Sequence, residues 1–190
     1  VKIAEDGEIL VSGENVMNGY WNDPDATSKT LIDGWVHTGD IGEFDDEDYL
    51  KITDRKKDIL VNAGGDNISP TRVEAKLDIE PEIAQSMLYG DFKNYLVAVI
   101  VPDKDFAINW AKENSKDQVL ETIVKDEDFY KVMKEVVNKV NKNLSVIEQV
   151  RKFILIDQEF TIENSMMTVS MKVRRFAVKD KYGDELEKLY

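Results

Sequence analysis

Asp54-Arg55-Lys56-Lys57-Asp58-Ile59-Leu60-Val61-Asn62-Ala63-Gly64-Gly65-Asp66-Asn67-Ile68-Ser69-Pro70 is the stretch of sequence that decides the fold. Its middle, Asp58 to Val61, predicts a short strand, which the Gly64-Gly65 turn ends. Ser69-Pro70 then predicts the N-cap and first position of a helix. A charged segment, a strand, a glycine turn and a helix start therefore follow one another within one short region.

The charge of the chain changes at the start of this region. Residues 1–54 carry 14 acidic and 3 basic side chains, whereas residues 55–190 carry 24 and 22. We therefore expect a domain boundary at the step from Asp54 to Arg55. Residues 1–54 have the pattern of strands and turns, including a hairpin in which 41–44 and 49–52 flank an acidic turn.

Residues 55–190 mix the helix and strand periods. Strands are predicted over 85–89, 95–101 and 151–157, and residues 103–148 are mostly helical. Apolar side chains recur at helical spacing from Phe129 to Ile147, which indicates one face of a long helix. A further helix is predicted from Arg175 to Tyr190. The fold class is therefore α+β, with a small mixed sheet flanked by helices and preceded by a strand-rich segment.

Composition excludes several classes of function. The net charge of −13 argues against a nucleic-acid-binding protein, which needs a basic face. There is no cysteine, and no stretch approaches the roughly 20 apolar residues of a membrane span. The acidic turn at 45–48 lacks the spacing of a calcium loop, so no metal site is predicted. We expect a cytoplasmic protein.

Four segments together carry a resemblance to a known family. They are Gly34-Trp35-Val36-His37-Thr38-Gly39-Asp40-Ile41-Gly42, the opening stretch 54–70, Ser170-Met171-Lys172-Val173-Arg174-Arg175, and Gly7-Glu8-Ile9 through Gly19-Tyr20-Trp21. In order and spacing they resemble the C-terminal part of adenylate-forming enzymes, and in detail long-chain fatty acyl-CoA synthetases. One departure is Met171, since many members have glycine directly before the lysine.

The resemblance implies a reaction and its substrates. Residues 1–54 would be the strand-rich end of the N-terminal AMP-binding domain, and residues 55–190 the mobile C-terminal lid domain. The full enzyme would join a fatty acid to CoA at the expense of ATP, through an acyl-adenylate. The phosphate loop, the acyl pocket and the Mg²⁺ ligands would belong to the N-terminal part outside this chain. We therefore expect the chain alone to be inactive.

The same resemblance assigns roles to individual residues. Lys172 would be the catalytic cation that gathers the reacting anions. Asp40 would accept hydrogen bonds from the ribose hydroxyls of the nucleotide, and Arg55 would add a nucleotide contact. Lys57 would be the hinge between the two domains. Ala63-Gly64-Gly65 would let the pantetheine arm of CoA approach the backbone closely.

Other interpretations stay open at this point. Lys172 could be a solvated lysine in a basic tail, and Asp40 a turn residue or a magnesium ligand. His37, the only histidine, is expected to have a structural role or to form a wall of the site. The chain could also belong to another carboxylic-acid-activating enzyme, or be a non-catalytic interaction module. Fatty substrates leave peripheral membrane contact open, and the oligomeric state is not predicted.

Overall fold

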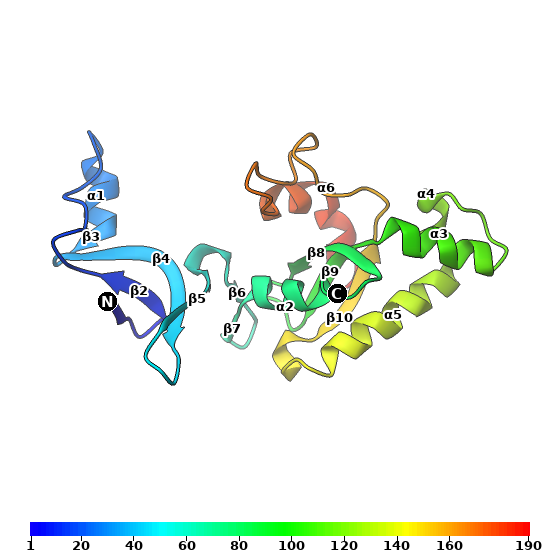
Figure 1. Ribbon diagram of the computed structural model, residues 1–190, viewed down its shortest axis with the longest axis horizontal. Helices are drawn as coiled ribbons and strands as arrows, with labels where there is room; N and C mark the ends of the chain where they lie inside the picture. The colour runs from blue at the N-terminus through cyan, green and yellow to red at the C-terminus, as the bar shows by residue number, and fades with distance from the viewer. The chain divides into compact units, whose positions relative to one another are not determined.

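The computed structural model describes all 190 residues, which form two compact units, Val1–Ile59 and Leu60–Tyr190 (Figure 1). The charge pattern placed the expected boundary slightly earlier, between Asp54 and Arg55. The reason is that strand β5, Leu50–Arg55, runs through that step and pairs with β4. Arg55 therefore belongs to the first sheet, and the assignment of the two units to named domains stays a prediction.

The first unit is a small antiparallel sheet. Strand β4, Trp35–Phe44, is its centre and pairs with β2, Glu8–Val11, and with β5. The short strands β1, Lys2–Ile3, and β3, Leu31–Ile32, extend the sheet. Helix α1, Pro24–Thr30, begins at the N-cap Asp23, and η1, Lys56–Asp58, is a single 3-10 turn. The predicted hairpin is present as β4 and β5.

The second unit is a three-stranded mixed sheet with helices, which confirms the α+β class. The strand order is β10-β9-β8, with β8 antiparallel and β10 parallel to the central β9. The strands are β8, Ile83–Tyr89, β9, Leu96–Pro102, and β10, Val150–Leu155, with β6, Leu60–Val61, and β7, Asn67–Ile68, as a separate hairpin. The helices are α2, Pro70–Leu77, α3, Lys104–Glu113, α4, Leu120–Ile123, α5, Glu127–Asn141, and α6, Arg175–Glu187, and η2, Val146–Glu148, is a 3-10 turn.

The central strand β9 is buried on both faces, and its alternating side chains enter two separate cores. Leu96, Ala98 and Ile100 pack with side chains of α2, α3 and α5. Val97 and Val99 point the other way and pack with α6 and the segment that follows β10. Figure 1 shows α6 on one side of this sheet and α2 and α5 on the other. The period of two along one strand thus builds both layers of the unit.

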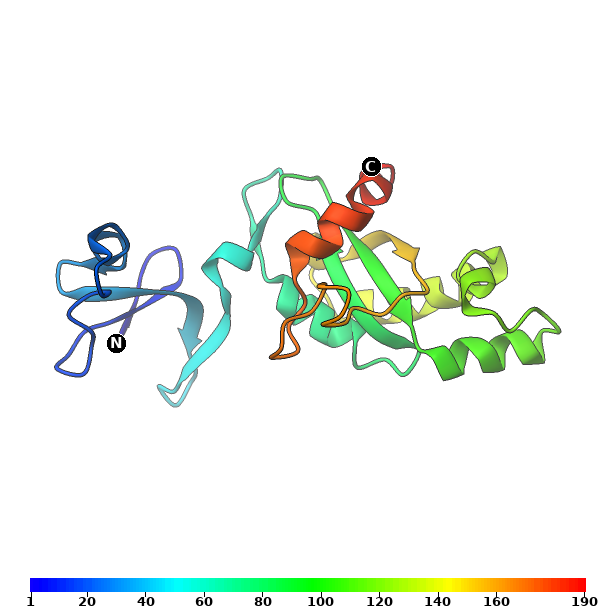
Figure 2. The ribbon, with the colours of Figure 1, turned by 90° about the horizontal axis from the view of Figure 1, so that it is seen from above.

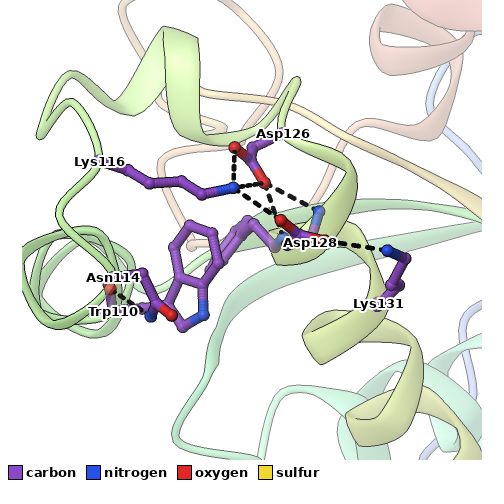
Figure 3. A network of polar contacts seen from close by, with 7 residues as sticks. Trp110, Asn114, Lys116, Asp126, Asp128 and Lys131 are labelled. Carbon is purple, nitrogen blue, oxygen red and sulfur yellow. Dashed lines mark hydrogen bonds and ion pairs between the residues drawn. The ribbon is translucent and has the colours of Figure 1, made fainter.

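A polar network fixes the start of the longest helix, α5 (Figure 3). Asp126 is its N-cap and accepts the backbone N–H groups of Asp128 and Phe129. The Lys116 ammonium bonds to both carboxylates, at 2.6 Å from Asp126 Oδ2 and 2.9 Å from Asp128 Oδ2, and lies over the Trp110 ring. Negative charges near the N-terminus of a helix interact favourably with the helix dipole, so this cluster is a structural cap.

Two expected elements differ from the structure. The long helix expected from Phe129 to Ile147 is wrong in its last six residues, because α5 ends at Asn141 and Ile147 is 42% exposed in a 3-10 turn. The Asn141 side chain bonds to the backbone of Val150, which draws the chain away from the helix axis into β10. The strand expected from Asp58 begins at Leu60, since residues 56–58 form η1.

Truncating the aromatic centre of the larger core tests this packing. Phe129 is fully buried against the rings of Trp110, at 4.9 Å, and Phe106, at 6.2 Å. We expect Phe129→Ala to lower the free energy of unfolding by about 3–5 kcal/mol in urea titrations, because it leaves a cavity. Ile147→Ala is the matched control and should change the free energy of unfolding by less than about 0.5 kcal/mol. Equal losses would contradict the assignment of the core.

Candidate functional site

Asp40 and Arg55 face each other across two neighbouring strands. They are direct partners in the register of β4 and β5, and Arg55 Nε lies 2.9 Å from Asp40 Oδ1. The Asp40 side chain is 23% exposed and that of Arg55 is 54% exposed. The structure thus brings together the two predicted nucleotide-binding residues, with a carboxylate oxygen and several guanidinium N–H groups left for a ligand.

The buried carboxylate of Glu8 holds the backbone that leads to Asp40. Glu8 is 4% exposed, and its Oε1 accepts the Gly39 N–H at 2.9 Å. Its Oε2 lies 3.0 Å from His37 Nδ1 and accepts the Lys56 ammonium at 2.9 Å. Burial raises the pKa of Glu8, but these three hydrogen bonds outweigh it and hold the pKa below its usual value. His37 therefore makes a structural contact.

The turn before Asp40 is fixed by a second set of bonds. The Thr38 hydroxyl donates to the Ile9 carbonyl at 2.7 Å and accepts the Asp40 N–H at 3.1 Å. Gly39 has a φ of +71°, a left-handed conformation that glycine adopts without a steric cost. The Thr-Gly-Asp sequence therefore places the Asp40 carboxylate at a defined position on the sheet.

Lys57 lies in the single turn η1, directly before the division between the two units. Its side chain is exposed, whereas the neighbouring Lys56 is anchored to Asp6 at 2.6 Å and to Glu8 at 2.9 Å. Lys56 therefore fixes the end of the first unit, and the exposed Lys57 is the next residue in the chain. The role of Lys57 as a hinge stays a prediction.

The glycine loop, residues 62–66, is organised by one side chain that the sequence did not single out. Asn62 Oδ1 accepts the N–H groups of Gly64, at 2.8 Å, and Asp66, at 2.9 Å. The Asn62 carbonyl accepts the Gly65 N–H at 3.0 Å, and Gly65 has a φ of +88°. Ala63, Gly64 and Gly65 are exposed, so their backbone is open to a ligand.

A neighbouring turn supports the glycine loop from the side. The Ala63 N–H donates to the Lys93 carbonyl at 3.0 Å, and the Phe92 N–H donates to the Val61 carbonyl at 2.7 Å. Asp91 accepts the Val61 N–H through its side chain at 3.0 Å. Figure 2 shows the two loops side by side beyond the end of the sheet. The turn between β8 and β9 therefore braces the segment.

Lys172 lies in a short closed loop, residues 167–173, one residue before its closing bridge. Met167 and Val173 form a β-bridge at its base, and the Thr168 N–H donates to the Lys172 carbonyl at 2.8 Å. The Thr168 hydroxyl accepts the Lys172 N–H at 3.0 Å. The side chain of Lys172 is exposed and makes no hydrogen bond or ion pair. The loop therefore holds the backbone of this lysine and leaves its ammonium free.

The residue before Lys172 has an unfavourable backbone conformation. Met171 has a φ of +59°, in the left-handed region, and its side chain is 70% exposed. For a side chain other than glycine this conformation costs roughly 1–2 kcal/mol. Glycine would adopt this conformation without that cost, and the loop keeps its turn with methionine in place.

The predicted site residues divide between the two units. Asp40 and Arg55 lie together in the first, and the glycine loop and Lys172 belong to the second. Sequence reasoning missed Glu8, although it lies in one of the quoted motif segments, and it missed Asn62. No group of three or more His, Asp or Glu side chains could hold a metal ion, and none of the helices has the length and apolar content that a membrane crossing requires.

Comparison with known proteins identifies the second unit. Residues 57–190 match the AMP-binding enzyme C-terminal domain family. Over 192 residues the chain is 36% identical to the long-chain-fatty-acid–CoA ligase FadD15 of Mycobacterium tuberculosis, a match that covers 100% of this chain and 32% of the relative. It is 33% identical to human long-chain-fatty-acid–CoA ligase 1, covering 97% of this chain and 27% of the relative.

A solved structure gives the same answer. The adenylation domain of a carboxylate reductase from Mycobacterium chelonae superposes with a TM-score of 0.81 at 28% identity, covering 97% of this chain and 27% of that one. The chain thus spans about a third or less of the proteins it matches. With the family match, the identities and the shared fold in agreement, the chain belongs to the C-terminal domain family of AMP-binding enzymes.

Proposed function

We propose that this chain forms the C-terminal part of an AMP-forming long-chain fatty-acid–CoA ligase. Its substrates would be a fatty acid, ATP and CoA, in the cytoplasm, and the Mg²⁺ that accompanies ATP would be held by residues outside this chain. The long-chain ligases among the relatives support the substrate class. Exposed apolar side chains of the first unit, such as Trp21 at 92% and Ile52 at 66%, support a larger protein surface that covers them.

The observation that carries the proposal is the free ammonium of Lys172 on a closed loop. Seven of the 20 lysines of the chain, including Lys93 and Lys116, form ion pairs with acidic side chains, and the exposed Lys172 is one of those that do not. A cation held by its backbone but unpaired at its end can be presented to a second anionic group without first breaking an existing bond. Such preorganised charge is the main electrostatic contribution that enzymes make to reactions between anions.

The first half-reaction needs this cation. A carboxylate oxygen of the fatty acid attacks the α-phosphorus of ATP, a new P–O bond forms, and the bond to the departing pyrophosphate breaks. Two anions must approach each other before any bond forms. Lys172 would offset this repulsion and neutralise charge on the oxygens around the α-phosphorus. It transfers no proton in this scheme.

The nucleotide would be oriented by the pair in the first unit. Asp40 would accept hydrogen bonds from both ribose hydroxyls, as a carboxylate can do for two neighbouring donors. Arg55 holds the carboxylate in place through the 2.9 Å contact. The Glu8 hydrogen bonds fix the backbone beneath it. The pair would therefore serve both half-reactions as a fixed reference for the adenylate.

The second half-reaction would use the glycine loop. The thiolate of CoA attacks the acyl carbon, the C–S bond forms, the bond from carbon to the phosphate oxygen breaks, and AMP leaves. The exposed backbone of Ala63, Gly64 and Gly65 can approach an extended arm because no side chain beyond Cβ intervenes. Rotation near Lys57 would bring this loop to the adenylate in place of Lys172.

A second candidate is another acid-activating adenylating enzyme. The fold similarity to a carboxylate reductase adenylation domain favours it, since that protein is not a CoA ligase by name. A non-catalytic interaction module is less well supported, because it would need neither the Asp40–Arg55 pair nor an unpaired lysine on a closed loop. Product analysis with a panel of long-chain, medium-chain and aromatic acids, with and without CoA, separates these functions.

Removing the cation tests the proposal directly. In the full-length protein we expect Lys172→Ala to lower the rate of acyl-adenylate formation by about 100-fold or more, measured by fatty-acid-dependent ATP–pyrophosphate exchange. The conversion of synthetic acyl-adenylate to acyl-CoA should stay within a few-fold of wild type. Lys188→Ala, at the end of α6, is the control. Unchanged exchange in the Lys172 variant would support the interaction module instead.

Deleting the ribose acceptor should change nucleotide preference. We expect the wild type to use ATP at least about 10-fold better than 2′-deoxy-ATP, in kcat/KM, because the half-buried Asp40 carboxylate loses one of its hydrogen-bond donors. Asp40→Ala should lower kcat/KM for ATP and reduce this preference to near one. A variant that keeps the preference would show that Asp40 binds something other than the ribose. Asp46→Ala, in the exposed acidic turn, serves as the control.

Loosening the glycine loop should affect the second step alone. Asn62→Ala removes the side-chain acceptor of the Gly64 and Asp66 N–H groups. We expect about a 10-fold lower rate of acyl-CoA formation from synthetic acyl-adenylate, with pyrophosphate exchange within a few-fold of wild type. Asn114→Ala, at the end of α3, is the matched control. The glycine loop would have no part in thioester formation if both rates were unchanged.

A further inference from the structure

Glu74, on helix α2, is a buried carboxylate with three hydrogen bonds. It is 8% exposed, and its Oε1 accepts the Leu88 N–H at 2.7 Å. The Arg175 guanidinium donates to both oxygens, from Nη1 to Oε1 and from Nη2 to Oε2, each at 2.5 Å. Two parallel bonds between planar groups fix direction as well as distance.

The Glu74–Arg175 ion pair lies beside the edge strand of the sheet. Leu88 belongs to β8, the outer strand, and its N–H is directed away from β9 toward Glu74. Helix α2 packs on one face of the sheet and α6, which begins at Arg175, packs on the other. The Glu74–Arg175 pair thus joins elements of the two layers and also satisfies a backbone donor at the edge.

Arg175 is the third residue after Lys172, and the chain between them is closely held. The Arg174 N–H donates to the Met166 carbonyl at 2.7 Å, and Val173 bridges to Met167. Met166 and Met167 are 4% and 7% exposed, so the other end of the loop is packed in the core. With both ends of the loop fixed, the direction in which Arg175 is held sets the direction of the loop tip.

We propose that Glu74 is the positioning residue for Lys172, acting through its bidentate pair with Arg175. This inference rests on the proposed role of Lys172 in adenylate formation. Glu74 does not touch the substrates in this scheme. It determines where the loop of residues 167–173 presents its ammonium, and it does so from helix α2, which follows the glycine loop after the short strand β7.

The packing of α6 argues against a purely structural role for the pair. Val178, Tyr182 and Leu186 are buried at regular spacing along α6 and hold the helix on the sheet. Buried ion pairs contribute little net stability relative to apolar packing, because both charges lose water. What the pair adds beyond that packing is a fixed orientation at the first residue of α6, directly beside the loop that carries Lys172.

The test measures the two half-reactions separately in the full-length protein. The variants are Glu74→Gln, which keeps an acceptor for Leu88, and Arg175→Gln, together with the double variant. Arg72→Gln is the matched control, because Arg72 lies on the same helix and pairs with the buried Glu148 at 2.6 Å, away from the lysine loop. Lys172→Ala is measured alongside. The readouts are pyrophosphate exchange, acyl-CoA formation from synthetic acyl-adenylate, and thermal melting.

We expect Glu74→Gln and Arg175→Gln each to slow pyrophosphate exchange by about 10–100-fold, because a small displacement of a catalytic group has this effect. Acyl-CoA formation should stay within about 3-fold, and the double variant should be no slower than the slower single variant. Arg72→Gln should leave both rates within about 3-fold. Arg175→Lys keeps the charge without the bidentate geometry, so it should slow exchange with little change in melting.

Several results would overturn the inference. In one such result, the Glu74 and Arg175 variants have the same rate of pyrophosphate exchange as Arg72→Gln, whereas Lys172→Ala has lost this activity. The inference would then be wrong, but the proposed function would stand. Another is equal loss of both half-reactions in all four Glu74 and Arg175 variants, including the double variant and Arg175→Lys, which would indicate a fold defect. Normal exchange in Lys172→Ala would overturn the proposed function and this inference together.

Discussion

The double-sided burial of strand β9 is the constraint on which the second unit depends. All seven residues from Leu96 to Pro102 are buried, so the strand needs apolar cover on both faces. Helices α2, α3 and α5 supply one cover, and α6 with the segment after β10 supplies the other. The resulting frame is rigid because its core is closely packed. The glycine loop and the lysine loop both extend from this frame, which is how two short exposed loops obtain defined positions.

Two buried carboxylates hold the backbone of the site where apolar packing cannot. Glu8 accepts the N–H of Gly39 and binds Lys56, and Glu74 accepts the N–H of Leu88 and binds Arg175. Each one satisfies a backbone donor and is itself neutralised by a cation, which offsets the cost of removing a charge from water. In the first unit the only buried apolar side chains of the core are those of Ile9 and Leu10, so the hydrogen bonds of Glu8 contribute a larger part of its structure.

Much of the fold followed from local sequence signals. Ser69 and Pro70 predicted the start of α2, and the run from Tyr95 to Val101 predicted β9, because capping and burial act over a few residues. The end of α5 was missed, since apolar spacing continues past Asn141, whereas the Asn141 side chain bonds to Val150 and Ser145 caps a new 3-10 turn. The roles of Glu8 and Glu74 were also missed. Their partners lie 48 and 101 residues away, and periodicity carries no information about such contacts. The only sequence signal for the left-handed turn at Met171 was that methionine stands where the resemblance predicts glycine.

The central claim is that a single positive charge, placed by a closed loop, makes adenylate formation fast. Because this chain has no cysteine, Lys172→Cys creates one alkylation site in it, and wild-type protein treated in parallel controls for cysteines elsewhere. Bromoethylamine converts the new cysteine to an ammonium side chain of nearly the length of lysine, whereas bromoacetamide gives a neutral amide. We expect the first reagent to restore fatty-acid-dependent pyrophosphate exchange and the second to leave it low. Exchange that is already at the wild-type rate in unmodified Lys172→Cys, or that is restored equally by the neutral adduct, would contradict it.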